Sequence, residues 1–277
     1  MNIYLHVEIS DRELDSKILI ATLAASKGHQ VIISDLIGIL RGVESGALAP
    51  GIFHTKSLSP SKDKTARHKN LIKKGFAITS IDEEAALNDH GYESFAKARY
   101  SEDMIEQTLA VFGWGSEDTE TLKKHYPKQS HKIYKTGSPR ADLWRSTFYN
   151  YWSVPSTLPK KPFLLISCNV GYANNVRSFG ELIKIENERG RFKRDPEYLK
   201  TRIGRTYEDY RKILEYIKAI KYLSENNNSY EIVLRPHPQE EKEAWEIMLQ
   251  DIPNVHVLRD GPINVWIQNA FAVMHNS

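Results

Sequence analysis

The sequence predicts a two-domain α/β protein with a parallel β-sheet in each domain. Short apolar segments alternate with amphipathic segments along nearly all of the 277 residues, which is typical of strands joined by helical crossovers. The stretch 153–162 carries three prolines in ten residues, and a second α/β series begins after it. We therefore expect an N-terminal domain over 1–152, a linker over 153–162 and a C-terminal domain over 163–277.

Composition and charge describe an ordinary globular chain with 40% apolar and 26% charged residues. A net charge of +3 and a pI near 8.7 suit anionic ligands or loose peripheral contact with the inner membrane, but not nucleic-acid binding. The single cysteine, Cys168, excludes an internal disulfide and a cysteine-cluster metal site. Because the first residues lack the pattern of a signal peptide, we expect a cytoplasmic protein. We also expect that it needs no metal or cofactor.

The N-terminal domain is predicted to open with a strand–helix–strand unit. Residues 3–7 are rich in β-forming side chains, and Ser10 and Glu13 have the spacing of a capping box at the start of a helix. Gly28 stands where a helix end favours positive φ, and 30–34 is the next strand. A unit of roughly 30 residues implies parallel strands joined by a right-handed crossover.

The same alternation predicts the remaining elements of both domains. In the first domain we expect strands at 51–54, 76–81, 109–113 and 132–136, and helices at 61–74, 101–107 and 116–125. In the second we expect strands at 163–168, 230–234, 255–258 and 270–274, and helices at 205–224, 240–249 and 263–269.

The last predicted strand, 270–274, is an apolar run without alternation, which is typical of an interior strand covered on both faces. Only three residues follow it in this sequence. We therefore expect the second domain to be incomplete.

Several enzyme classes lack their motifs here. The turn after the first strand has no Gly-x-Gly-x-x-Gly fingerprint, which argues against a dinucleotide-dependent dehydrogenase. Walker A, His-Glu-x-x-His and Gly-x-Ser-x-Gly motifs are also absent. The sequence therefore does not favour a P-loop NTPase, a zincin or an α/β-hydrolase.

The tetrapeptide Arg235-Pro-His-Pro238 directly follows a predicted strand, at the end where open α/β sheets bind ligands. The guanidinium of Arg235 has the planar shape that binds phosphate, and His237 can donate a hydrogen bond to it. Glu240 could orient the histidine or a ribose. The alternative is a strand-ending turn in which the histidine has no role.

Two further strand ends carry small polar residues. Asn169 and Gly171 follow the strand 163–168, and Asn276 and Ser277 follow the last predicted strand. Ser277 would cap the next helix, whose N-terminus favours phosphate. Together the three strand ends predict a nucleotide cradle, although an ordinary Asn/Gly turn at 169–175 is nearly as good an interpretation.

Acidic residues follow two strands of the first domain. Asp82, Glu83 and Glu84 come after the strand 76–81, and Glu8 comes after the first strand. Carboxylates at these ends could act as a base or nucleophile in glycosyl chemistry, or they could simply be acids favoured at helix N-termini. Arg140, after the last strand of this domain, is either a phosphate clamp or a structural cation.

A family resemblance is carried by segments that span nearly the whole chain: Tyr4–Asp15, Lys56–Leu58, Asp82–Glu84, Gly113–Gly115, Thr136–Arg140, Arg235–Pro238 and His275–Ser277. These segments resemble bacterial surface-carbohydrate biosynthesis proteins of the glycosyltransferase B type. The Gly-Ser-Pro-Arg and Arg-Pro-His-Pro elements are also similar to a wider group with the 3-deoxy-manno-octulosonate (Kdo) transferases, CDP-glycerol glycerophosphotransferases and UDP-N-acetylglucosamine 2-epimerases.

The resemblance implies two Rossmann-like domains, with a nucleotide held by the second and an acceptor met by the first. It also implies that His237 and Pro238 contact the donor phosphate, and that Ser277 does the same.

From the residues and the resemblance together we expect a glycosyltransferase of surface polysaccharide biosynthesis. Its donor would be a nucleotide-activated sugar, with a CMP-linked sugar among the candidates, and its acceptor a saccharide or a lipid-linked molecule. Cationic side chains and helix N-termini could neutralise the leaving phosphate without a metal. The alternatives are a sugar-nucleotide epimerase and a non-catalytic nucleotide-sugar-binding assembly protein.

Overall fold

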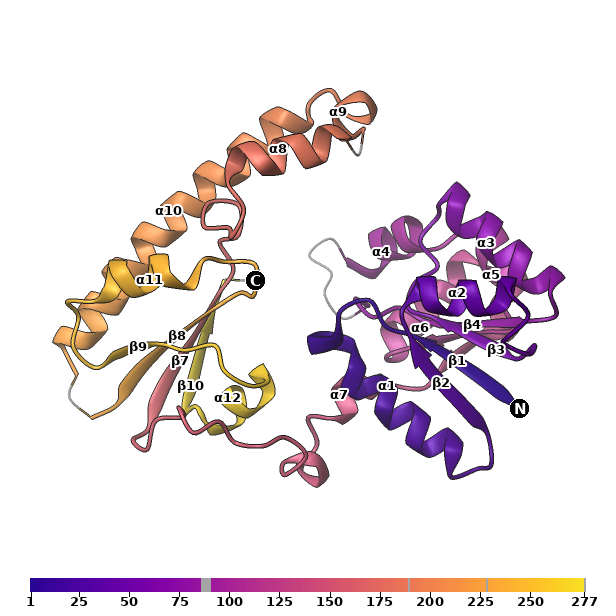
Figure 1. Cartoon of the computed structure of the whole chain (residues 1–277), viewed down its shortest axis with the longest axis horizontal. Helices are drawn as coiled ribbons and strands as arrows, with labels where there is room; N and C mark the ends of the chain where they lie inside the picture. Colours follow the sequence, from indigo (N-terminus) through magenta and orange to yellow (C-terminus); the bar gives the residue numbers. More distant parts are fainter. Residues whose placement is uncertain (86–90, 189, 228, 277) are drawn as a thin grey trace. The chain divides into compact units, whose positions relative to one another are not determined.

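The chain forms two compact α/β units, residues 1–148 and 149–277, each built on one parallel sheet (Figure 1). The computed structural model describes residues 1–85, 91–188, 190–227 and 229–276. The predicted fold class, an α/β chain with two Rossmann-like parallel sheets, is confirmed. Within the described residues, no helix is long and apolar enough to cross a membrane.

The first unit contains a six-stranded sheet in the order β2-β1-β3-β4-β5-β6. All neighbours are parallel, so every strand ends at the same edge. From β1 the chain adds β2 on one side and β3 on the other, which makes the β1/β3 boundary a topological switch point. The strands are β1 Asn2–His6, β2 Gln30–Ser34, β3 Ile52–Thr55, β4 Ala77–Ile81, β5 Ala110–Gly113 and β6 Ile133–Lys135.

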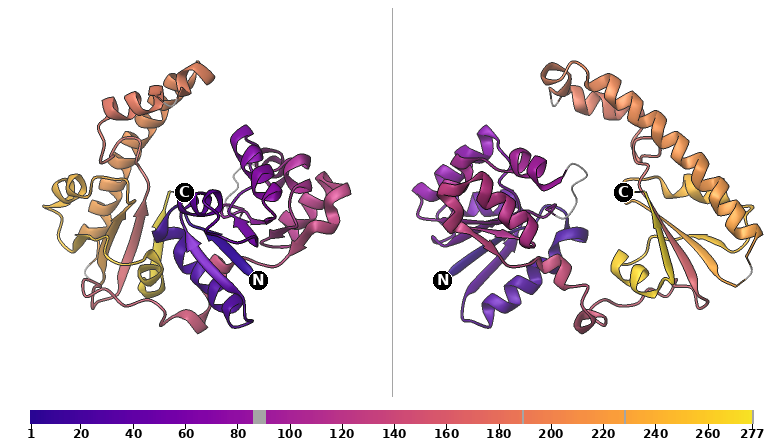
Figure 2. Two further views of the ribbon diagram at one scale, coloured as in Figure 1. Left: turned by 45° about the vertical axis from the view of Figure 1, so that its right-hand side comes forward. Right: turned by 180° about the vertical axis from the view of Figure 1, so that it is seen from behind.

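Helices connect these strands and cover the sheet (Figure 2). Apolar side chains such as Tyr4, Phe53 and Ile78 are buried in one of the two cores of this unit. The α-helices are α1 Ser10–Ala25, α2 Leu36–Glu44, α3 Lys62–Lys73, α4 Gly91–Arg99, α5 Glu102–Glu106, α6 Ser116–His125 and α7 Pro139–Asp142, with 3-10 turns η1 Pro127–Lys132 and η2 Ser146–Phe148.

The predicted capping box at the start of α1 is wrong. Ile9 occupies the N-cap position, so Ser10 is already helical and its hydroxyl does not cap the helix. The Glu13 carboxylate instead accepts the backbone N–H of Glu8 at 2.8 Å. The Gly28 prediction holds, with a φ of 80° at the end of the same helix.

The second unit contains a four-stranded parallel sheet in the order β10-β7-β8-β9. From β7 the chain adds β8 and β9 on one side and then crosses to place β10 on the other, so the switch point lies between β7 and β10. The strands are β7 Phe163–Cys168, β8 Glu231–Pro236, β9 Val255–Val257 and β10 Ala272–His275.

The last predicted strand, 270–274, forms as β10 Ala272–His275, and its interior place in a complete domain stays a prediction. Within the described residues β10 pairs with β7 alone, at the edge of the sheet. Its residues alternate between half-buried and exposed, and Met274 packs against the core while Val273 is 39% exposed. The strand therefore packs against the core with one face and exposes the other face.

The helices of the second unit include one very long element, α10, whose last half packs on the sheet through Ile213, Tyr216 and Ile220. Its first half extends away from the sheet together with α8 and α9 (Figures 1 and 2). The helices are α8 Phe179–Glu188, α9 Arg191–Arg194, α10 Tyr198–Glu225, α11 Lys242–Leu249 and α12 Ile263–Asn269.

The proline-rich segment 153–162 forms neither helix nor strand, and it lies within the second unit. Pro155 packs against Gly261, where a Cβ atom would lie 2.8 Å from the proline ring. Gly261 also has a φ of 62°, so both space and backbone conformation favour glycine there. The boundaries 1–152, 153–162 and 163–277 and the linker role remain predictions.

Candidate functional site

Three strand ends of the second unit meet at its switch point. Ser167 of β7 stands in register with Arg235 of β8 and with His275 of β10, so the loops that follow these strands begin at the same level of the sheet. These loops contain most of the residues predicted to bind the nucleotide. Ser277, also predicted there, lies outside the described residues.

Asn169 and Asn276 join the two sides of the switch point. The backbone N–H of Asn169 donates to Asn276 Oδ1, and Asn276 Nδ2 donates to the carbonyl oxygen of Asn169, both at 2.9 Å. Gly171 lies in the turn that follows, where a Cβ would be 3.8 Å from Asn169 Oδ1. Space alone therefore does not require glycine at this position.

His237 is half-buried at the end of β8, and its ring orientation is set locally. The backbone N–H of Gln239 donates to Nδ1 of His237 at 3.2 Å. Because Nδ1 accepts this bond, the proton of the neutral ring is on Nε2. That nitrogen can donate a hydrogen bond, as a phosphate-binding histidine must.

Glu240 is fully buried and holds the strand-end loops together. Its Oε1 accepts the backbone N–H groups of Val170 at 3.1 Å and of His237 at 3.2 Å, and its Oε2 accepts the indole N–H of Trp245 at 2.8 Å. The carboxylate thus accepts the backbone N–H of His237. We therefore interpret Glu240 as a residue that positions both loops and has no exposed atom for a ribose.

The surroundings of Glu240 are strongly buried. Burial, and then the nearby carboxylate, raise the pKa of the Cys168 thiol. Burial, followed by the charges of Cys168 and Glu240, raises the pKa of Tyr216 to about 12. Cys168 is therefore an unreactive thiol in the core of this unit.

Two arginines contact the loops beyond β8 and β9. Arg235 donates to the carbonyls of Asp260 at 3.0 Å and Gly261 at 2.5 Å, and burial lowers its pKa to about 10. Arg259, which sequence analysis missed, donates to the carbonyls of Glu240 at 3.1 Å and His237 at 3.5 Å. No motif marks Arg259, because its role depends on a loop about 20 residues earlier.

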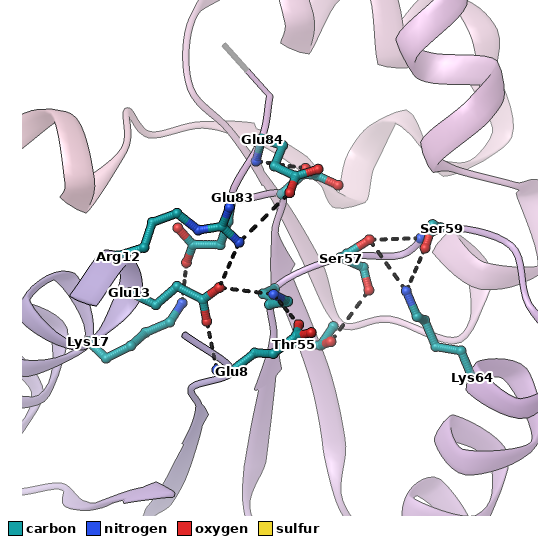
Figure 3. A network of polar contacts seen from close by, with 12 residues as sticks. Glu8, Arg12, Glu13, Lys17, Thr55, Ser57, Ser59, Lys64, Glu83 and Glu84 are labelled. Atoms are coloured by element: carbon teal, nitrogen blue, oxygen red, sulfur yellow. Dashed lines mark hydrogen bonds and ion pairs between the residues drawn. The ribbon is translucent and has the colours of Figure 1, made fainter. Parts of the chain in front are cut away.

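The predicted acids of the first unit also come together, within a network of ion pairs (Figure 3). Asp82 is fully buried and receives two hydrogen bonds of 2.9 Å from Arg99. Glu83 is buried in an ion pair with the fully buried Lys17. Both carboxylates are therefore neutralised by cations from other segments.

Glu8 and Glu84 are the accessible members of the network, with side chains 60% and 45% exposed. Glu8 pairs with Lys56, and Glu84 lies 3.2 Å from Arg99. Accessibility favours these two over Asp82 and Glu83 for any proton transfer to a bound molecule.

Sequence analysis missed the buried centre of this network, Glu13. Burial by itself would raise its pKa, but the backbone N–H of Glu8 and the ammonium of Lys56 at 2.9 Å outweigh burial and lower it. Lys56 has a raised pKa, since its bonds to the two glutamates outweigh its own burial. The sequence predicted for Glu13 only a place in a capping box.

Arg140 lies in the first unit, at the start of α7. Its Nη1 donates to the backbone carbonyl of Glu83 at 2.7 Å, which ties α7 to the loop after β4. This contact agrees with the structural alternative for Arg140. A role as a phosphate clamp remains a prediction.

The sequence matches no known family model and no curated protein sequence. Among solved structures, S. aureus MnaA in its complex with UDP is similar over 100% of this chain and 74% of that chain, with a TM-score of 0.55 and 11% identity. This likeness concerns the fold.

Two weaker matches have TM-scores below 0.5, where a shared fold does not follow. An accessory secretory protein complex of Streptococcus pneumoniae matches with a TM-score of 0.38 and 10% identity, over 81% of this chain and 35% of that chain. The spinosyn rhamnosyltransferase SpnG with spinosyn aglycone matches with a TM-score of 0.35 and 12% identity, over 99% of this chain and 74% of that chain.

Proposed function

We propose that this protein is a glycosyltransferase of surface polysaccharide biosynthesis that uses a nucleotide-activated sugar. The observation that carries the proposal is the meeting of the β7, β8 and β10 loops at the switch point of the second unit. In open α/β sheets this is where a nucleotide binds. The fold shared with MnaA, which was solved with UDP, supports the same class of ligand.

The chemistry of these loops suits a diphosphate or monophosphate. His237 offers an Nε2–H donor on a loop stiffened by two flanking prolines. Arg259 adds positive charge behind the same loop. Hydrogen bonds to charged oxygens are stronger than neutral ones, and charge on the leaving phosphate grows during transfer. Both residues would therefore stabilise the departing nucleotide.

The first unit would meet the acceptor, a saccharide or a lipid-linked molecule. Glu8 and Glu84 are our candidates for the group that removes the acceptor proton, because their side chains are accessible. Asp82 and Glu83 would hold the loop in place through Arg99 and Lys17. The donor sugar could be linked to CMP, CDP or UDP, and binding of these three nucleotides distinguishes the possibilities.

Isothermal titration calorimetry against CMP, CDP and UDP tests the donor site. We expect His237→Ala to weaken binding of the preferred nucleotide by about 1–3 kcal/mol, because a hydrogen bond to a charged oxygen is lost. Gln239→Ala is the matched control, since it leaves in place the backbone N–H that orients the ring. Equal affinity of folded His237→Ala and the native protein would overturn the assignment.

Product analysis then separates the activities. Transfer that requires an acceptor supports the glycosyltransferase. Interconversion of the sugar nucleotide without an acceptor would instead indicate an epimerase, and binding without turnover would indicate a non-catalytic assembly protein.

A further inference from the structure

The first unit has a pocket at its own switch point, about 410 Å³ in volume, where β1, β2 and β3 end. Residues from all three strand ends and from α3 line it, and of these only Glu8 was predicted as a site residue. We call it the cationic pocket; its polar lining includes His6, Lys56, Ser57, Lys64 and Arg67.

Two of its cations have no counter-charge at hand. Among the described residues, no carboxylate oxygen lies within ion-pair distance of Lys64 or Arg67. The acids that line the pocket are used elsewhere: Glu8 pairs with Lys56, and Asp35 accepts the Gly38 N–H at the start of α2 at 2.5 Å. Lys64 and Arg67 therefore make no direct ion pair in the described part of the chain, and Asp82 and Asp63 act on them only at longer range.

The Lys64 ammonium is instead held by neutral oxygens (Figure 3). It donates to the hydroxyls of Ser59 at 2.6 Å and Ser57 at 3.4 Å. Burial, and then the charges of Arg67 and Arg99, lower its pKa to about 8. A cation held beside other cations without a carboxylate is destabilised until an anion arrives.

Buried polar atoms at the pocket also lack partners within the described part of the chain. His6 is only 8% exposed, and its Nδ1 has no hydrogen bond. The buried Nε of Arg67 has none either. Buried polar groups are nearly always paired in native proteins, so a partner for these two atoms, a water or a polar group of a ligand, is expected at the pocket.

We propose that the cationic pocket binds an oxyanion, a phosphate or carboxylate group carried by the acceptor. Lys64 and Arg67 supply the charge, and Ser57 and His6 supply further hydrogen bonds. Two cations of one helix that make no direct ion pair suit a group of charge −1 to about −2, which covers a carboxylate and a phosphate monoester. That the anion belongs to the acceptor rests on the proposed function. That the pocket binds an oxyanion rests on the pocket alone.

Calorimetry of the full chain with saturating nucleotide tests this, because any phosphate site of the second unit is then occupied. The probes are inorganic phosphate, glycerol 3-phosphate and glucuronate, which separate a phosphate ligand from a carboxylate ligand. We expect Lys64→Gln/Arg67→Gln to weaken binding of the preferred probe by roughly tenfold or more. Lys69→Gln/Lys73→Gln removes the same charge from exposed positions of α3 and should change it less than twofold.

The pocket variant should fold, since it relieves crowding between like charges, and circular dichroism checks this. Unchanged probe affinity in Lys64→Gln/Arg67→Gln would overturn the proposal, as would an equal loss in both double variants or no binding of any probe to the native chain. Nucleotide affinity of the pocket variant is measured in parallel. If it stays native while probe binding falls, the oxyanion site stands whether or not the glycosyltransferase assignment does.

Discussion

Replacing Glu240 with alanine should destabilise the second unit more than any surface change. The carboxylate accepts three N–H groups, those of Val170, His237 and Trp245, and it is fully buried. Leaving each donor buried without a partner costs about 1.5 kcal/mol, so the loss is about 4–5 kcal/mol. This is a large part of the stability of an ordinary domain.

Glu240→Gln separates the role of charge from that of shape. It keeps one acceptor oxygen for the two backbone N–H groups but turns an NH₂ toward the indole N–H of Trp245, so we expect a loss of about 1–3 kcal/mol. Glu246→Ala is the control. Its partner Lys242 is one helical turn away on the exposed face of α11, and such pairs contribute about 0.5 kcal/mol or less.

Urea unfolding followed by hydrogen exchange is the suitable assay, because peptides from 149–277 report the second unit separately from the first. We expect the losses to rank Glu240→Ala, Glu240→Gln, Glu246→Ala. A loss below about 1 kcal/mol for Glu240→Ala would mean that this carboxylate does not hold the two loops together.

Two further predictions concern the first unit. Glu83→Gln leaves the fully buried ammonium of Lys17 without its counter-charge and should cost about 3–5 kcal/mol in urea unfolding, whereas Lys17→Met/Glu83→Leu should recover most of it; equal losses in both would contradict this. Acid should also destabilise this unit, because burial lowers the pKa of His54 to about 3 and of His68 to about 4. The unfolded chain then binds more protons below about pH 6.5, so each histidine removes about 2 kcal/mol between pH 7 and pH 5. His68→Leu should remove about half of that pH dependence, and an unchanged pH profile would be inconsistent with a buried neutral His68.

Local patterns predicted much of the secondary structure. The segments 116–125, 163–168 and 263–269 form α6, β7 and α12 with the predicted ends. The helices α2, α4, α7, α8 and α9 were missed. The helix α2 was missed because Gly38 and Gly42, which have a low helix propensity, weaken the helical pattern of its sequence. Asp35 nevertheless begins that helix by accepting the Gly38 N–H.

Patterns along the chain were enough to predict the α/β class, the parallel strands and the strand ends at which polar residues gather. The contacts that those residues make depend on the tertiary fold. Lys17 and Glu83 are 66 positions apart, and Asn169 and Asn276 are 107 apart, yet each pair is in direct contact. Strand order brings such segments together, and no local periodicity records it. Whether a carboxylate is buried beside a cation, as Glu83 is, or accessible, as Glu84 is, therefore follows from packing between distant segments.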